Sequence, residues 1–364
     1  MDNISSLVRQ NENRFQYQLL HKNSLVLEIS SGEVTVASKE KLPFDLRHYE
    51  TVGYAEWLNW LKRRIDTLQR TYMNQLYKQR RLGRGHVEVI NDSNAISPID
   101  LFWIKAGHHQ IDWESLQEKR DFLMSTALTS LEGKLDPKAM FGKKEDRISI
   151  LTTKGTFPKA IYQNHLLKKG DNAEYEISGY RIAEHLGIPS AKAFLGEDNI
   201  VYCELFTNDK LGMVHALEYI YPFDAETYAD IYTRSLALFS GNAEINHGIQ
   251  RLFIFSYLIS NNDLHGENFG FLYDNETFNI VSIAPAYDFN AAFDAWGDPT
   301  LYDPTIMNNL EELIKNNPDI IAKLATLPSV VKSDAYLSEE QKQEILIRAE
   351  YLLLLYKQKR GAGI

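Results

Sequence analysis

Hydrophobic and polar positions follow two different periods in the first part of the chain. Between Ser24 and Ala37, short alternating runs flank Ser-Ser-Gly-Glu, which is typical of two β-strands joined by a short loop. From Tyr54 to Lys78, large apolar side chains recur at helical spacing, with basic side chains between them. The pattern therefore predicts a β-hairpin followed by an amphipathic helix. Its basic run, from Lys62 to Arg84, indicates either a solvated face, which we favour, or a surface for an anionic partner.

The pattern changes at Arg147. Apolar runs at 148–151 and 160–168 flank a glycine-containing segment and predict strands on both sides of a loop. Residues 172–186 have apolar positions at near-helical spacing, and Gly187 follows as a helix stop. Short apolar runs at 201–206 and 213–220 predict two more strands. A strand that carries lysine thus leads into a helix that carries glutamate.

Beyond Asp224 the pattern becomes helical. Residues 249–259 are apolar on nearly all sides, which predicts a buried helix. Ser338 and Gln341 have the spacing of a capping box and predict the start of a long C-terminal helix.

Composition narrows the class of protein. A chain of 364 residues with 44% hydrophobic and 24% charged residues is typical of a globular protein with one large or several smaller domains. Its net charge of -10 argues against broad binding to nucleic acid or anionic membranes. The first 15 residues lack a signal-peptide pattern, and no stretch is apolar enough to span a membrane, so we expect a cytoplasmic protein. The single cysteine, Cys203, excludes an internal disulfide.

Candidate chemistry gathers directly after the predicted buried helix. The segment NNDLHGENF contains Asp263 and Asn268, and Asp288 follows beyond a predicted hairpin. Phosphoryl transfer requires a carboxylate beside the attacking hydroxyl and oxygen ligands that hold magnesium against the phosphates. In the protein-kinase template, the catalytic Asp and a metal-binding Asn lie five positions apart, and a second metal carboxylate follows later. Asp263, Asn268 and Asp288 fit that order, although each alone could belong to an ordinary turn.

Two neighbours of Asp263 have open roles. His265 is a second candidate for a general base, but its neighbours Leu264 and Gly266 favour a structural role. We expect Glu267 to be a solvated loop residue rather than a metal ligand.

Binding of ATP also requires a cation near the phosphates, usually a strand lysine that a helix glutamate orients. Lys168 and Glu176 fit that pair, with Lys169 and Glu174 as close competitors. Lys159 either points along the same sheet toward phosphate or is an exposed strand lysine. The chain contains neither GxxxxGK[ST] nor GxGxxG, which disfavours P-loop and Rossmann proteins.

A single glycine, Gly155, marks the loop before these strands. It would let the backbone approach a phosphate, although an ordinary turn explains it as well.

Together these motifs resemble the HipA-like serine/threonine kinases. The shared pattern is Asp-x-His-x-x-Asn followed by Ala-Pro-x-Tyr-Asp, which spans residues 263–268 and 284–288 here. The resemblance is good from about Arg147 to Asn290 and thin before that, where only Ser97 to Ile104 is similar to some single-chain relatives. It implies an α+β, two-lobed protein-kinase-like fold. The expected parts are an N-terminal mixed α/β subdomain at 1–146, an ATP-binding part with a hinge at 147–223, and a helical C-lobe at 224–364.

The resemblance also implies ATP and Mg²⁺ as cofactors. It implies the following roles: catalysis by Asp263, magnesium binding by Asn268 and Asp288, phosphate binding by Lys168, orientation of that lysine by Glu176, and adenine contacts by a hinge that contains Glu204 and Phe206. Some relatives phosphorylate a hydroxyl residue of the phosphate loop and thereby silence the enzyme. The matching residues are Thr152 and Thr153, which are also ordinary strand-end residues. The chain departs from the family in Glu267, where a basic residue is common, and in a phosphate loop poor in glycine.

The function expected from this resemblance is that of a protein kinase acting on Ser or Thr of a protein substrate. Better-known relatives are toxins that pair with a DNA-binding antitoxin, so a toxin role and an antitoxin or regulatory partner are hypotheses here. We expect no direct binding to nucleic acid and none to membranes. Two alternatives remain open: a kinase for a small molecule or lipid headgroup, and a nucleotide-binding pseudokinase that acts as a regulatory module through its basic helix.

Overall fold

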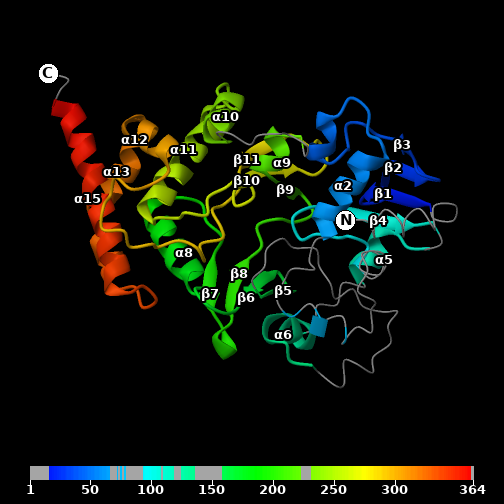
Figure 1. The fold of residues 1–364 in the computed structure, drawn as a ribbon, viewed down its shortest axis with the longest axis horizontal. Coiled ribbons are helices and arrows are strands. Elements are labelled where there is room, and N and C mark those ends of the chain that lie inside the picture. The colour runs from blue at the N-terminus through cyan, green and yellow to red at the C-terminus, as the bar shows by residue number, and fades with distance from the viewer. Residues whose placement is uncertain are drawn as a thin grey trace.

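The computed structural model describes residues 16–65, 72, 74–75, 78, 93–107, 110–118, 124–135, 158–222 and 231–361. Over these residues the chain forms a mixed α/β fold with three antiparallel sheets (Figure 1). The strand predicted at 148–151 and most of the helix predicted beyond residue 65 lie outside the described residues.

The first sheet has the strand order β3-β2-β1-β4. Its strands are β1 (Tyr17–His21), β2 (Ser24–Ser30), β3 (Glu33–Val36) and β4 (Phe102–Ala106). The hairpin predicted from Ser24 to Ala37 is present as β2 and β3. A 3-10 helix, η1 (Phe44–His48), and the helix α2 (Tyr54–Ile65) follow, and α2 buries Trp57, Trp60 and Leu61 as its pattern predicted. Two short helices, α5 (Trp113–Glu118) and α6 (Met124–Glu132), come after β4.

The second sheet has the order β5-β6-β8-β7. It contains β5 (Lys159–Tyr162), β6 (His165–Lys168), β7 (Ala193–Leu195) and β8 (Val201–Glu204), with a 3-10 turn, η3 (Glu197–Asn199), between the last two. The apolar run at 160–168 is therefore a hairpin rather than one strand, because Gln163 turns the chain with a φ of 52°. The helix α8 (Tyr175–Leu186) follows β6 and ends at Gly187, whose φ of 70° favours glycine.

The third sheet has the order β11-β10-β9 and joins distant parts of the chain. Its strands are β9 (Leu211–His215), β10 (Gly270–Asp274) and β11 (Ile280–Ile283). The strand predicted at 213–220 is wrong beyond His215, where the helix α9 (Ala216–Ile220) begins. The chain leaves the sheet there because the backbone N–H of Leu217 donates to the carbonyl of Gly266 in a loop, 2.8 Å away.

Helices form the C-terminal part, at the end of the molecule opposite the first sheet (Figure 1). They are α10 (Ile231–Leu238), α11 (Ala243–Leu258), α12 (Pro304–Asn316), α13 (Pro318–Leu324), α14 (Leu327–Lys332) and α15 (Glu339–Gly361). The predicted capping box is present, because Ser338 N–H donates to Gln341 Oε1 at 2.9 Å and Gln341 N–H donates to Ser338 Oγ at 3.2 Å.

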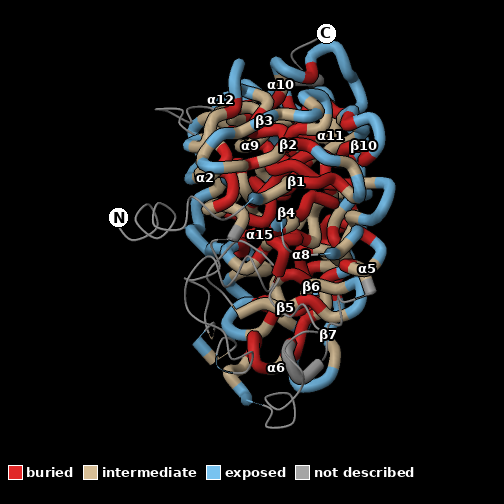
Figure 2. Tube along the Cα trace, turned by 90° about the vertical axis from the view of Figure 1, so that its right-hand side faces the viewer, coloured by how far each residue is buried: buried red, intermediate tan, exposed pale blue. Residues whose placement is uncertain are grey.

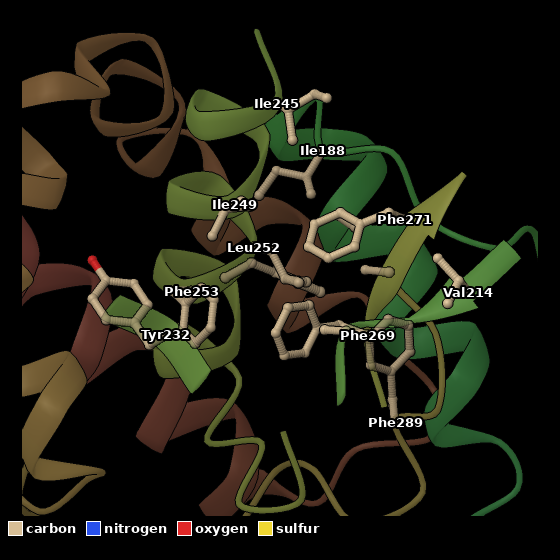
Figure 3. Close-up of a cluster of buried hydrophobic side chains, with 14 of the residues drawn as sticks. Ile188, Val214, Tyr232, Ile245, Ile249, Leu252, Phe253, Phe269, Phe271 and Phe289 are labelled. Atoms are coloured by element: carbon tan, nitrogen blue, oxygen red, sulfur yellow. The ribbon is translucent and has the colours of Figure 1, made fainter. Parts of the chain in front are cut away.

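The predicted buried helix is α11, which runs through the largest core of the described residues. Figure 2 shows buried backbone along the interior of the molecule, with exposed segments outside it. Around α11, Phe253 packs edge-to-face on Phe269, with ring centroids 5.6 Å apart (Figure 3). Within the described residues, no helix has both the length and the apolar character required to cross a membrane.

Candidate active site

A cleft of about 380 Å³ lies where the three sheets and the loops after α11 approach one another. This volume falls within the range of small-molecule sites, which is about 300–1,000 Å³. The candidate site residues that line it are Lys159, Lys168, Glu176, Glu204, Phe206, Asp263, His265, Asn268 and Asp288, and Lys169, Cys203 and Glu267 line it as well. Gly155, Thr152 and Thr153 lie outside the described residues, so their roles stay predictions.

Lys168 and Glu176 form a buried ion pair at the cleft. Lys168 lies at the end of β6 and Glu176 in the first turn of α8, and Lys168 Nζ is 2.7 Å from Glu176 Oε1. The competing lysine, Lys169, points elsewhere and pairs with Glu132 of α6. The side chains of Lys168 and Glu176 are 11% and 3% exposed, so their charges are largely removed from water. A buried pair of this kind fixes the position of an ammonium group.

Asp288 joins this pair from a distant part of the sequence. Its Oδ1 is 2.7 Å from Lys168 Nζ, and the next backbone N–H, of Phe289, donates to Glu176 Oε1 at 2.9 Å. Asp288 has a φ of 65°, in the left-handed region that few non-glycine residues adopt. Such conformations are held by surrounding contacts and concentrate at functional sites. The Phe289 ring packs closely on Gly179 of α8, where an added Cβ would be 2.3 Å from the ring.

The charges of the cluster shift one another's ionisation. Burial alone would lower the pKa of Lys168, but the charges of Asp288 and Glu176 raise it above its ordinary value. Burial opposes ionisation of Asp288, but the Lys168 charge outweighs it and lowers the pKa of Asp288. Lys168 is therefore cationic and Asp288 anionic at neutral pH, as phosphate and metal binding would require.

Asp263 and Asn268 are held together in the loop after α11. The Asn268 side-chain amide donates from Nδ2 to both the backbone carbonyl and Oδ2 of Asp263, each at 2.8 Å. The Asp263 side chain is 46% exposed, so its carboxylate is accessible from the solvent side of the cleft. The spacing of five residues thus brings both side chains to one point, as predicted.

His265 supports Asp263 from the same loop. Its Nδ1 accepts the backbone N–H of Glu267 at 3.2 Å, which leaves the ring proton on Nε2, 3.5 Å from Asp263 Oδ1. In this tautomer the ring faces Asp263 with a donor, an arrangement that orients a base and fits the structural role that the sequence favoured.

The hydrophobic core fixes both candidate metal ligands. Asn268 is followed by Phe269 and Asp288 by Phe289, and both rings are 2% exposed. Both rings belong to the core cluster that includes residues of α11 (Figure 3). Since each polar side chain is adjacent to an anchored ring, its backbone has little freedom to move.

These two residues could serve a hard cation such as Mg²⁺. Asn268 uses Nδ2 for Asp263, which leaves Oδ1 as its ligand atom, and Asp288 offers a carboxylate. Within the described residues, no group of three or more His, Cys, Asp or Glu side chains is arranged to hold a metal. Two protein oxygens fit magnesium all the same, because it commonly completes its shell with water and substrate phosphates.

Two contributions to the cleft escaped the sequence analysis. The hydroxyl of Tyr287 lies 3.2 Å from His215 Nδ1 and donates to the backbone carbonyl of Glu267 at 3.2 Å, which ties the Asp288 segment to the Asp263 loop. The segment Ser97–Asp100 from the N-terminal region also lines the cleft. Tyr287 lies in the Ala-Pro-x-Tyr-Asp motif, and Ser97–Asp100 lies in the stretch similar to single-chain relatives, but neither pattern indicated these positions in the cleft.

Comparison with known proteins finds a matching family and two similar solved structures. Residues 129–314, just over half of the chain, match the family described as the HipA-like C-terminal domain. HipA of Shewanella oneidensis MR-1, solved in the toxin–antitoxin complex with HipB and operator DNA, is 14% identical, and the match covers 94% of this chain and 97% of that one with a TM-score of 0.60. The proinflammatory kinase CtkA of Helicobacter pylori is 16% identical over 57% of this chain and 94% of its own, with a TM-score of 0.39. No curated protein matches.

Proposed function

Because the chain belongs to the HipA-like family, we propose that it is an ATP- and Mg²⁺-dependent phosphotransferase that acts on Ser or Thr of a protein. One observation carries the proposal. The buried Lys168 contacts two carboxylates, Glu176 and the candidate metal ligand Asp288, each at 2.7 Å. Asp263 and Asn268 line the same cleft. This is the set of groups that phosphoryl transfer requires.

Each residue has a distinct task in this proposal. Lys168, held by Glu176, binds phosphate oxygens of ATP. Asn268 and Asp288 would hold Mg²⁺, which neutralises developing charge on the phosphates when bound. Asp263 accepts a hydrogen bond and then the proton from the acceptor hydroxyl, while its link to Asn268 keeps its carboxylate beside a candidate metal ligand.

The remaining expectations belong to the same proposal. The second sheet with α8 would form an ATP-binding N-lobe, and the helical part would form the C-lobe of a two-lobed kinase. Glu204 and Phe206, which line the cleft, would contact adenine, with Lys159 near the phosphates. Thr152 or Thr153 would be the site of autophosphorylation. The proposal also includes a toxin role, an antitoxin partner and a cytoplasmic location.

The basic helix gives less support to the pseudokinase alternative than its sequence suggested. Arg63 pairs with Asp45, and Arg64 pairs with Asp100 at 2.6 Å, so both guanidinium groups bind within the molecule. The half-exposed Asp263 is also placed for access by an acceptor, which favours a catalytic protein.

The acceptor class can be tested with γ-labelled ATP and Mg²⁺ in a cell lysate. We expect the label on Ser or Thr of a protein with wild-type enzyme, and background labelling with Asp263→Asn and Asp288→Asn variants. Label found only in a small molecule or lipid would replace the protein acceptor with that alternative. Mapping of phosphopeptides from the purified protein alone tests Thr152 and Thr153, and label only elsewhere would reject autophosphorylation of the loop.

A further inference from the structure

A short segment of the N-terminal region is hydrogen-bonded to the chain directly after the expected hinge, which ends at Phe206. Thr207 Oγ1 donates to the carbonyl of Pro98 at 2.6 Å, and the backbone N–H of Met213 donates to the carbonyl of Ile99 at 2.7 Å. The Ile99 side chain packs in the apolar cluster that contains Met213, Phe206 and Tyr287. All of these residues except Thr207 line the cleft, so Ser97–Asp100 forms part of its wall near Phe206.

Arg64, in the last turn of α2, holds this segment from the other side. Its two terminal nitrogens donate to the two carboxylate oxygens of Asp100, each at 2.6 Å. The same guanidinium donates from Nε to the carbonyl of Ala95 at 2.5 Å and from Nη2 to the carbonyl of Phe102 at 2.7 Å. One side chain therefore fixes Asp100 and the backbone on both sides of the segment.

This arrangement is better suited to setting geometry than to adding stability. The Arg64 and Asp100 side chains are 8% and 10% exposed, and a buried ion pair of this kind gains little over a well-packed apolar pair. A bidentate contact from a planar guanidinium, however, fixes direction as well as distance. The preceding residue, Arg63, pairs with Asp45 of η1 instead, so the contacts that hold the segment belong to Arg64.

We propose that Arg64 is a positioning residue for the nucleotide. Through Asp100 it holds Ser97–Asp100 against Thr207 and Met213, and so sets the shape of the cleft next to Phe206. This inference rests on the proposed function, because it takes the cleft to be the ATP site. The family match begins at residue 129, so the role lies in a part of the chain outside that match. A ligand or protein that moves α2 would thereby alter the nucleotide end of the cleft.

A double-mutant cycle in the full chain tests the contacts on both sides of Ser97–Asp100. Arg64→Lys removes the bidentate clamp, and Thr207→Val removes the hydrogen bond to Pro98 with little change in volume. We expect each change to weaken binding of ATP by about three- to tenfold, because the wall of the cleft next to Phe206 would lose contacts that hold it in place. The turnover number at saturating ATP should stay within about twofold, because the acceptor-side residues are untouched. Since both changes act through one segment, the double variant should lose less than the product of the two single effects.

Controls separate this role from general damage to the fold. Lys62→Ala changes a basic residue of the same helix that is not among the described residues lining the cleft, and it should leave ATP affinity unchanged. Urea unfolding of each variant shows which are folded, and if Arg64→Lys fails to fold, Thr207→Val alone carries the test. Unchanged ATP affinity in the folded variants, or effects that multiply independently, would overturn the role of Arg64 while the proposed function stands. A wild-type protein that binds no ATP would overturn both.

Discussion

Lys168 and Asp288 are 120 residues apart in the chain, yet Lys168 Nζ lies 2.7 Å from Asp288 Oδ1. The first ends a strand of the second sheet, and the second follows β11 of the third sheet. Their contact joins the second and third sheets at the cleft. Lys168 Nζ is also 2.7 Å from Glu176 Oε1, so one ammonium group binds a carboxylate from each part of the cleft.

Replacement of Lys168 by Met should damage both binding and stability. It would remove the cation that contacts both Glu176, which is 2% exposed, and Asp288. Removal of one partner from a buried ion pair costs about 3–5 kcal/mol in free energy of unfolding. We therefore expect a loss of that size in urea unfolding, together with loss of ATP binding in a direct titration.

A second variant separates these two effects. In Lys168→Met with Glu176→Gln, the buried uncompensated charge is removed, so part of the stability should return while ATP binding stays lost. If the Lys168→Met single variant were as stable as wild type, the ion pair would not hold the position that the structure gives it.

Gly179→Ala should impair catalysis through Phe289. The added methyl group would be 2.3 Å from the Phe289 ring, so the ring and the adjacent Asp288 must move. Overpacking of this kind costs about 1–3 kcal/mol, although alanine is the better helix former. We expect a lower free energy of unfolding and a lower turnover number with ATP and Mg²⁺.

Gly241→Ala is the matched control, because a Cβ there would have no heavy atom within 4 Å. It should retain wild-type stability and activity. Wild-type turnover in a folded Gly179→Ala variant would show that the position of Phe289 does not control Asp288.

His21 predicts a pH dependence of stability that is separate from catalysis. Burial lowers its pKa to about 4 from an ordinary 6.5, and its ring packs between Phe102 and Phe278. Between pH 6.5 and pH 4, His21 is protonated in the unfolded chain but neutral in the folded protein. The contribution of neutral His21 to the free energy of unfolding is therefore complete above pH 6.5 and is lost as the pH falls to 4. The full contribution amounts to about 3 kcal/mol in free energy of unfolding.

The measurement is urea unfolding at several pH values with wild type and His21→Phe, which keeps an aromatic ring in the cluster. The difference in free energy of unfolding between the two proteins should change with pH over this interval. A constant difference would mean that His21 titrates alike in both states.

Local patterns predicted the parts of the site that depend on short stretches of chain. The loop from Asp263 to Asn268 folds on itself, and its five-residue spacing is sufficient to bring the two side chains together. Lys168 and Glu176 are eight residues apart across one strand–helix connection, so their contact also followed from local order. The hairpin predicted after Asn268 is confirmed by the antiparallel pairing of β10 and β11, and its sequence pattern is local as well.

Contacts that depend on tertiary packing could not be predicted in this way. The run at 213–220 is mostly apolar and has no turn residue, so only the packing of α9 against the Gly266 loop shows where the strand ends. Arg64 has the sequence environment of a solvated helix face, but its partners lie 31 to 38 residues further along the chain. Periodicity shows which face of a helix is polar, whereas it does not show which carboxylate that face will meet.

The most direct test of the central claim compares Mg²⁺-dependent transfer of the ATP γ-phosphate with ATP affinity in the same purified samples. Asp263→Asn should bind ATP within about threefold of wild type, because Asp263 acts on the acceptor, and lose transfer by about 100-fold or more. Asp209→Asn, on an exposed turn, should match wild type in both measurements. Equal transfer by wild type and Asp263→Asn, or tight ATP binding by wild type without any transfer, would contradict the assignment of Asp263 as the catalytic base.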